Sequence, residues 1–126
     1  METIEIVGTN KSPFVKFDAE VGLIEIKGRS AIENTIEFYK PLVEWISLYR
    51  SSPKASTEIK IYLEYFNTAT SKCLTDLFKE IDALFKDGYQ VNFNWYYEDE
   101  DILESGQDYQ SFLKVPFNMV ELEIAD

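Results

Sequence analysis

The stretch TEIKIYLEYFNTATS, residues 57–71, changes from the period of a strand to that of a helix. Apolar and polar side chains alternate over residues 57–66, as they do in a strand with one buried face. After Asn67 the apolar residues recur at steps of three and four, which predicts an amphipathic helix that ends near Lys86 and Gly88. The chain therefore passes from a strand directly into a helix.

Hydroxyl and amide side chains occupy this junction. Asn67 or Thr68 is the expected N-cap, and Thr70 and Ser71 follow in the first turn. The free N–H groups and the dipole of a helix N-terminus also stabilise a phosphate. Two interpretations stay open from the residues alone, a plain cap and a regulatory phosphorylation site. Ser, Thr and Asn are the ordinary residues at helix starts, which favours the plain cap.

Strand and helix patterns alternate along the rest of the chain. Extended segments are predicted at residues 3–7, 14–17, 23–27, 89–97 and 117–123, with further helices at about 30–50 and 98–112. The order β-β-β-α-β-α-β-α-β predicts a single α/β domain over residues 1–126. Its sheet is expected to be mixed and mostly parallel, with an antiparallel edge and helices packed against it.

Three features of the helical patterns give specific expectations. Ser30 and Glu33 have the spacing of a capping box for the first helix. Pro41 is expected either to bend that helix near Tyr39 or to divide it. Gly106 makes the middle of the last helix uncertain.

Composition argues against several functions. The net charge of −11 opposes binding to nucleic acid. The chain has no histidine, which removes Ser-His and Cys-His nucleophile pairs and the commonest zinc ligand. Its 5 glycines stand singly, without a phosphate-binding loop, and its 1 cysteine, Cys73, falls in a helix pattern where packing is expected. No apolar run approaches the ~20 residues of a membrane span, so we expect a cytoplasmic protein without membrane insertion, cofactor or catalytic residues.

An acidic run begins the last helix and raises the possibility of a divalent-cation site. Its members are Glu98, Asp99, Glu100, Asp101, Glu104 and Asp108. Their spacing lacks the alternating ligands and central glycine of a calcium loop, so we interpret them as favourable charge at a helix start. A small divalent-cation-dependent enzyme and a passive scaffold domain remain the alternatives to a regulatory binding protein.

The carboxyl ends of parallel strands meet at one edge of a sheet, where α/β folds usually bind their ligands. Three junctions should share this edge, at residues 28–30, 67–70 and 96–99. We therefore expect Arg29, Thr68 and the acidic start of the last helix to be close together. Aromatic residues favour interfaces, which makes Phe66 and Tyr96 candidates for partner binding.

Several segments together resemble the SiaC family of bacterial regulatory phosphoproteins, whose domain is similar to the STAS domain of anti-sigma-factor antagonists. The resemblance extends over residues 13–117. It is carried by Gly28-Arg29-Ser30, Glu33-Asn34, Phe38-Tyr39, Pro41-Leu42, Trp45, Leu63-Glu64-Tyr65-Phe66-Asn67-Thr68, Trp95-Tyr96-Tyr97-Glu98-Asp99 and Gly106-Gln107-Asp108-Tyr109.

The resemblance implies a phosphorylation switch. A dedicated Ser/Thr kinase would modify a threonine, a phosphatase would restore it, and the unmodified protein would bind and regulate a target, for which the family implies a diguanylate cyclase. The Tyr-Phe-Asn-Thr element places the phosphoacceptor at Thr68, with Thr70 and Ser71 as alternatives. Arg29, Ser30, Phe66, Asn67 and Tyr96 are then the expected partner-binding residues.

Overall fold

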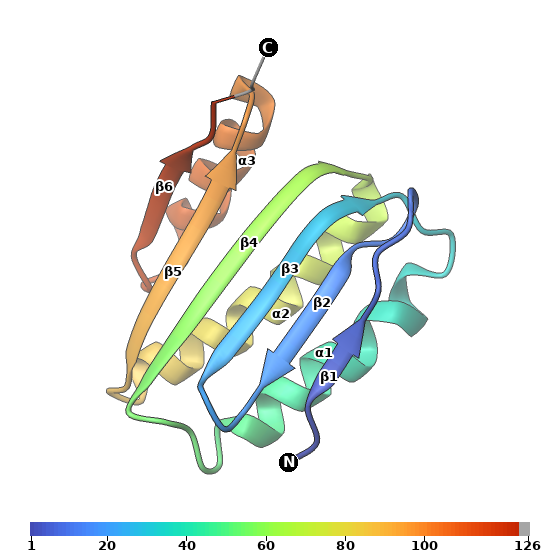
Figure 1. The fold of residues 1–126 in the computed structure, drawn as a ribbon. Coiled ribbons are helices and arrows are strands. Elements are labelled where there is room, and N and C mark those ends of the chain that lie inside the picture. The colour runs from blue at the N-terminus through green and yellow to red at the C-terminus, as the bar shows by residue number, and fades with distance from the viewer. Residues whose placement is uncertain (124–126) are drawn as a thin grey trace.

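The computed structural model describes residues 1–123 and has a six-stranded sheet covered by three helices (Figure 1). The strands are β1 (Ile4–Ile6), β2 (Phe14–Asp18), β3 (Leu23–Ser30), β4 (Ser56–Phe66), β5 (Gln90–Tyr97) and β6 (Phe117–Glu121). The helices are α1 (Thr35–Tyr49), α2 (Thr68–Lys86) and α3 (Glu100–Phe112). This element order confirms the predicted α/β class.

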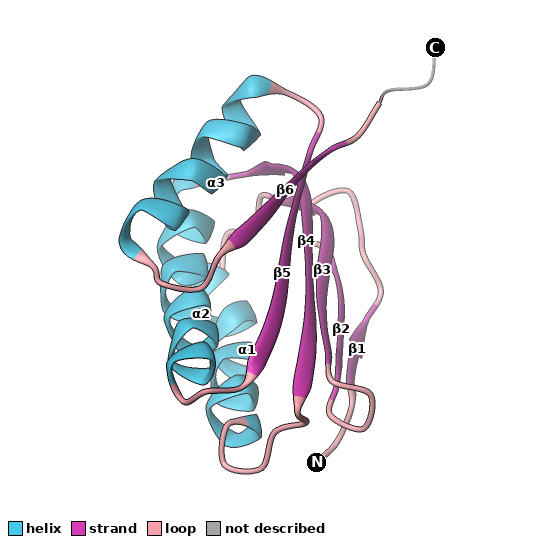
Figure 2. Cartoon of the chain, turned by 90° about the vertical axis from the view of Figure 1, so that its left-hand side faces the viewer, coloured by secondary structure: helices cyan, strands magenta, loops and turns pink. Residues whose placement is uncertain are grey.

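The strands lie in the sheet in the same order as in the chain. The first three pair antiparallel, and β3, β4, β5 and β6 pair parallel. Each parallel pair is joined by one helix, and right-handed crossovers that always step in the same direction place their helices on the same face. Figure 2 shows all three helices on one side of the sheet, which leaves the other side uncovered.

The uncovered face of the sheet is polar. Lys16, Glu25, Lys60 and Asn94 are neighbours on successive strands and form a row across this face. Opposite charges on adjacent strands stabilise a sheet, and a sheet with one solvated face normally carries such residues. The apolar side chains of the same strands point toward the helices.

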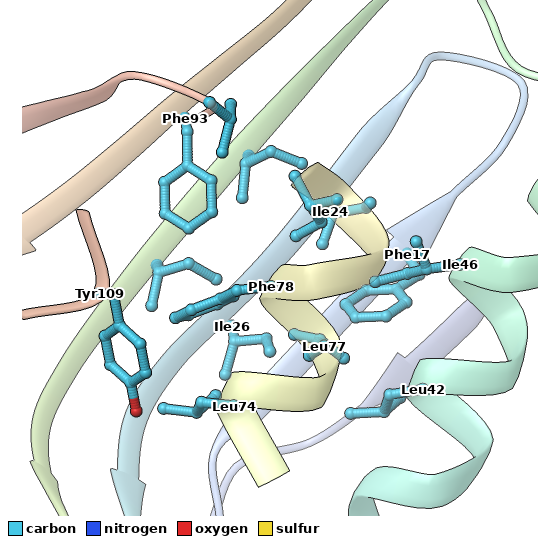
Figure 3. Packing of buried hydrophobic residues seen from close by; sticks show 14 of the residues in the cluster. Phe17, Ile24, Ile26, Leu42, Ile46, Leu74, Leu77, Phe78, Phe93 and Tyr109 are labelled. Atoms are coloured by element: carbon cyan, nitrogen blue, oxygen red, sulfur yellow. The ribbon is translucent and has the colours of Figure 1, made fainter. Parts of the chain in front are cut away.

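The core between sheet and helices is centred on Phe78 of α2 (Figure 3). Its ring lies edge-on to those of Phe93 and Tyr109, with centroid distances of 5.1 and 4.9 Å. Phe93 in turn stacks on Phe117 of β6 at 3.9 Å. Edge-to-face and offset-stacked aromatic pairs add to the free energy of burial, so this cluster joins α2 and α3 to the far end of the sheet.

The predicted capping box is wrong. The strand β3 runs to Ser30, whereas α1 begins only at Thr35, and its N-cap Asn34 makes no side-chain cap hydrogen bond. The strand extends because the register shifts between Gly28 and Arg29, where the glycine has φ of 114°, and pairing with β4 then continues. A positive φ is open to glycine at little cost, and this residue therefore permits the longer strand.

The expected division of the first helix at Pro41 is also wrong, since α1 continues through that residue. The other expectation, a bend of the helix near Tyr39, is compatible with this continuous helix. Proline inside a helix costs about 3 kcal/mol, but burial of one large apolar side chain offsets about 1.5–3 kcal/mol. The helix buries several on its core side, namely Tyr39, Leu42, Trp45, Ile46 and Tyr49.

The last helix is continuous at Gly106, and the reason for the glycine is a close approach to Trp95. A Cβ at this position would lie 2.6 Å from Nε1 of the indole. The same Nε1–H donates to the carbonyl of Ile102 at 2.9 Å, which holds the ring against α3. Gly106 therefore allows α3 to pack directly on a buried tryptophan of β5.

We expect Gly106→Ala to lower the free energy of unfolding by about 1–3 kcal/mol, because overpacking would displace the Trp95 ring. In an open helix the same change would stabilise by about 1 kcal/mol, so the sign of the effect is diagnostic. Urea unfolding followed by tryptophan fluorescence measures it. The exposed neighbour Gln107→Ala is the control, and a stabilised Gly106→Ala variant would contradict the packing.

A buried carboxylate holds the connection between α3 and β6. Oδ1 of Asp82, a residue only 4% exposed, accepts the backbone N–H groups of Lys114 and Val115, both at 2.8 Å. Oδ2 lies 3.1 Å from Nζ of Lys86. Burial by itself would raise the pKa of Asp82, but the Val115 N–H, Lys86 and the Lys114 N–H outweigh it and hold the pKa below its usual value.

Asp82→Asn is expected to lower the free energy of unfolding at pH 7 by about 1–2 kcal/mol, because it loses charge-assisted hydrogen bonds. Since the folded pKa is depressed, this stabilisation is present above the unfolded pKa of about 3.9 and disappears as the pH falls below it. Unfolding measured at pH 7 and pH 3 should therefore give a smaller difference between variant and wild type at pH 3.

The matched control is Asp87→Asn. This carboxylate is 47% exposed and lies 3.5 Å from Arg50, so its loss should change stability by about 0.5 kcal/mol or less. A difference between Asp82→Asn and wild type that stayed constant with pH would refute the assigned role of Asp82.

Candidate functional site

Thr68 is the first residue of α2 and is exposed. Figure 1 shows that α2 begins where β4 ends, at the carboxyl ends of the parallel strands. Asn67 is the N-cap of this helix, and its Oδ1 accepts the backbone N–H of Thr70 at 2.8 Å. The Asn67 side-chain amide also donates to the carbonyl of Ile32 at 3.2 Å. The predicted N-cap therefore exists, and it connects the helix start to the chain that follows β3.

Ser30, the last residue of β3, is hydrogen-bonded to the start of α2. Its carbonyl accepts the Asn67 N–H at 3.0 Å and the Thr70 hydroxyl at 3.2 Å. Its own hydroxyl lies 2.8 Å from Thr70 Oγ1 and 2.9 Å from the Tyr39 hydroxyl. Each hydroxyl has one proton to donate. Because the Thr70 hydroxyl donates to the Ser30 carbonyl, the Ser30 hydroxyl donates to Thr70 Oγ1, and the Tyr39 hydroxyl donates to the Ser30 hydroxyl.

This chain of hydroxyls is enclosed in the protein. Ser30 and Thr70 are both 0% exposed, and Tyr39 is 1% exposed. Burial is the main cause that raises the pKa of Tyr39 well above its ordinary value, so Tyr39 stays a neutral donor at physiological pH. We name Tyr39, Ser30 and Thr70 the hydroxyl chain. It fixes α2 to both β3 and α1.

Ser71 attaches the same turn to α3. The Tyr109 hydroxyl donates to the Ser71 carbonyl at 2.9 Å and lies 3.2 Å from the Ser71 hydroxyl. The Thr70 hydroxyl is therefore bonded in the interior, and the Ser71 hydroxyl is bonded to Tyr109 at a half-buried position. Among the candidate phosphoacceptors, Thr68 is the exposed residue.

Arg29 and Phe66, near the ends of the paired strands β3 and β4, are accessible to different degrees. Arg29 is exposed, and its guanidinium lies 5.2 Å from the centre of the Tyr65 ring. Phe66 is half-buried, edge-on to Trp95 at 6.4 Å. Tyr65 is 44% exposed and was not among the predicted site residues, although its place in the strand pattern beside Phe66 was a signal. Ser30, in contrast, is enclosed and supports the site from within.

Tyr96 lies on the uncovered face of the sheet, beside Tyr62 at 6.4 Å between ring centroids. The Tyr62 hydroxyl donates to Glu98 at 2.7 Å, and burial followed by this bond raises the pKa of Tyr62 to about 12. This contact binds the acidic start of α3 to the middle of β4, about 13 Å along the strand from Phe66. Of the three junctions expected to lie together, residues 28–30 and 67–70 are joined by hydrogen bonds. Within residues 1–123, no hydrogen bond joins residues 96–99 to either of them.

The acidic run stabilises the N-terminus of α3. Oδ1 of Asp99 accepts the Ile102 N–H at 2.9 Å as N-cap, and Glu100 and Asp101 occupy the first turn. Carboxylates at a helix N-terminus interact favourably with its dipole. In the part of the chain that the structure describes, no three acidic or cysteine side chains converge as a metal site would require.

Tyr39 and Tyr109 are the supporting residues that the sequence pattern did not reveal. Both occupy core-facing helix positions, where an aromatic residue is read as packing. The one feature of the sequence that could have indicated this role is the tyrosine hydroxyl, because a buried tyrosine usually has a hydrogen-bond partner.

The comparison with protein families gives a match over residues 6–122 to the family described as "SiaC family regulatory phosphoprotein". The chain belongs to the SiaC family. It is accordingly a regulatory protein and not an enzyme. No helix within residues 1–123 combines the length and apolar character needed to cross a membrane.

Relatives from Pseudomonas aeruginosa agree with this family. An uncharacterized protein of strain UCBPP-PA14 is 24% identical over 119 residues, which are 93% of this chain and 94% of the relative. The crystal structure of apo-SiaC has a TM-score of 0.88 at 22% identity and covers 95% of this chain and 99% of SiaC. The structure of the diguanylate cyclase SiaD with its activator SiaC gives the same score and identity, covering 94% and 99%. The solved structures establish a shared fold.

Within the SiaC fold of this chain, we expect Thr70→Val to lower the free energy of unfolding by about 1–3 kcal/mol. The change keeps the shape of the side chain but removes the acceptor of the buried Ser30 hydroxyl proton and one of the two donors to the Ser30 carbonyl. Thr68→Val is the matched control, because it removes an exposed hydroxyl from the same helical turn and should change stability by about 0.5 kcal/mol or less. Thermal unfolding of both variants measures the difference, and equal effects would refute the role of the hydroxyl chain.

Proposed function

We propose that this SiaC-family protein is a phosphorylation-controlled regulator that binds and regulates a diguanylate cyclase while Thr68 is unmodified. The observation that carries the proposal is the contrast in accessibility at the start of α2. Thr68 is exposed, whereas the neighbouring hydroxyls of Thr70 and Ser71 are bonded to Ser30 and Tyr109. A Ser/Thr kinase could reach Thr68 without unfolding the helix.

A phosphate at Thr68 would be compatible with the fold. It would add about −1.5 to −2 charges at the N-terminus of a 19-residue helix, where the backbone N–H groups and the dipole stabilise an anion. The cap and the hydroxyl chain below it use Asn67, Ser30 and Thr70, so phosphorylation of Thr68 breaks none of their bonds. The switch therefore changes the surface of the protein and leaves its core intact.

The effect of the phosphate falls on partner binding. Asn67 directly precedes Thr68, Phe66 is the last residue of β4, and Arg29 lies opposite Tyr65 on the paired strand β3. We propose these three as contact residues, with Ser30 as their support. Tyr96 would belong to the same interface only if the partner also reaches the uncovered face. A surface that fits a small neutral hydroxyl would have to desolvate a dianion, which opposes association.

The proposal includes a dedicated kinase and a dedicated phosphatase, and it places the single domain in the cytoplasm. The cyclase as target is supported by the relative from Pseudomonas aeruginosa, in which SiaC is named as the activator of SiaD. The net charge of −11 further supports a protein partner over nucleic acid.

The test measures binding to the purified diguanylate cyclases of the source organism by calorimetry. We expect unmodified protein and Thr68→Ala to bind one of them, and Thr68-phosphorylated protein and Thr68→Asp to bind about tenfold or more weakly, a loss of about 1.4 kcal/mol. Mass spectrometry of Thr68→Ala after kinase treatment should detect no phosphate at Thr70 or Ser71. Equal affinity of the phosphorylated and unmodified proteins would overturn the switch.

A further inference from the structure

Ile36 in the first turn of α1 is 74% exposed, an unusual position for a large apolar side chain. It lines two hollows on the surface of α1 and α2. These two helices pack side by side (Figure 2). One hollow, of about 290 Å³, extends from Ile36 to Ala69. The other, of about 260 Å³, has a floor formed by Tyr39, Val43 and Cys73. We name these two hollows together the α1–α2 groove.

The groove begins at the switch position. Ala69 lines its first hollow, is exposed, and directly follows Thr68 in α2. Ile36 belongs to both hollows, so the groove continues from there along the two helices. A partner that contacts Thr68 from the helix side therefore meets this groove next.

The rim of the groove is acidic. Glu33 and Glu37 border the first hollow, and Glu44 and Asp76 border the second, whereas Lys40 is the cation among the lining residues. Within residues 1–123 the ion pairs join Arg50, Glu80, Asp82, Lys86 and Asp87, which leaves these four carboxylates without one. An apolar floor with an acidic rim complements a segment that is apolar on one side and basic on the other.

Resting on the function proposed above, we propose that the α1–α2 groove binds a basic amphipathic helix of the diguanylate cyclase. Apolar side chains of that helix fill the hollows on either side of Ile36, and its basic side chains face Glu44, Asp76 and the glutamates near Thr68. Such a helix-in-groove contact uses apolar anchors about one or two turns apart. The charged flanks set the orientation of the helix and the salt dependence of binding.

This occupant is consistent with inhibition by phosphorylation. A basic partner is attracted to a phosphate, but an exposed ion pair is weak because solvent screens it. The apolar anchor next to Ala69 would instead remove water from the adjacent dianion, and desolvating a charge costs more than an exposed ion pair contributes. The unfavourable term is the larger one, so the phosphate weakens docking even though it adds attraction.

The central test compares two identical substitutions on one helix. Ile36→Glu places a charge in the groove, and Leu48→Glu places the same charge on α1 at a residue 60% exposed, about 18 Å further along the helix. Calorimetry with the cyclase that binds unmodified protein should give about tenfold or greater loss for Ile36→Glu and about twofold or less for Leu48→Glu. Circular dichroism of each variant confirms that it is folded.

The sole cysteine of the chain provides a second measurement that needs no change of the groove. Cys73 is half-buried in the groove floor, and bound cyclase should slow its reaction with N-ethylmaleimide at pH 8. The control is Leu48→Cys with Cys73 retained, in which peptide mass spectrometry follows the two thiols separately, and the thiol introduced at position 48 should react at the same rate with and without cyclase. Equal rates at Cys73 would overturn the groove as the docking site.

Charge reversal tests the chemistry of the occupant. Glu44→Lys together with Asp76→Lys should weaken binding and flatten its dependence on salt, because the partner charge would then be repelled. The exposed Glu104→Lys on α3 should change binding by about twofold or less. Tighter binding of the double variant would overturn the assignment of a basic partner helix.

The outcomes separate this proposal from the switch. If Thr68→Asp weakens binding but Ile36→Glu does not, the groove is refuted and the switch stands. If Ile36→Glu weakens binding but the state of Thr68 has no effect, the groove stands and the switch is refuted. If no cyclase of the source organism binds, or if Ile36→Glu impairs phosphorylation and leaves cyclase binding unchanged, the proposed occupant is refuted.

Discussion

The structure around Thr68 depends on Ser30, the last residue of β3. Its carbonyl accepts two hydrogen bonds from the start of α2, and its hydroxyl joins Tyr39 and Thr70. Every buried polar group in this set has a partner, which is the condition under which a polar network stabilises a core. The strand end, the first helix and the second helix are therefore fixed to one another at a single point. Thr68 is exposed in the same turn of α2 that these hydrogen bonds hold in place.

A second constraint is the order of the strands. Because the sheet grows in one direction and its crossovers are right-handed, all the helices lie on one face. The same face therefore carries the core, the start of α2 and the α1–α2 groove, while the other face stays polar. This arrangement places the start of α2, with Thr68, next to the α1–α2 groove.

The acidic groups at the start of α3 have structural roles, since Asp99 caps that helix and Glu98 accepts the Tyr62 hydroxyl. At a net charge of −11, any further negative charge adds to the electrostatic self-repulsion of the protein. Membership of the SiaC family fits a protein that acts through the surface it presents to a partner.

Local patterns were enough to predict the element order, the mixed sheet and the N-cap region, because side-chain period and capping chemistry depend on near neighbours in the chain. Resemblance to the family, carried by short motifs, selected Thr68. Other features depended on contacts between distant residues. Ser30 belongs to a strand because a register shift continues its pairing with β4, and Gly106 is required because α3 packs on Trp95. Whether a hydroxyl faces solvent or the core was likewise decided by the tertiary structure, since Thr68 and Thr70 are the same residue type in one helical turn. Their hydroxyls differ in exposure because β3 and α1 pack against the side of the turn that carries Thr70.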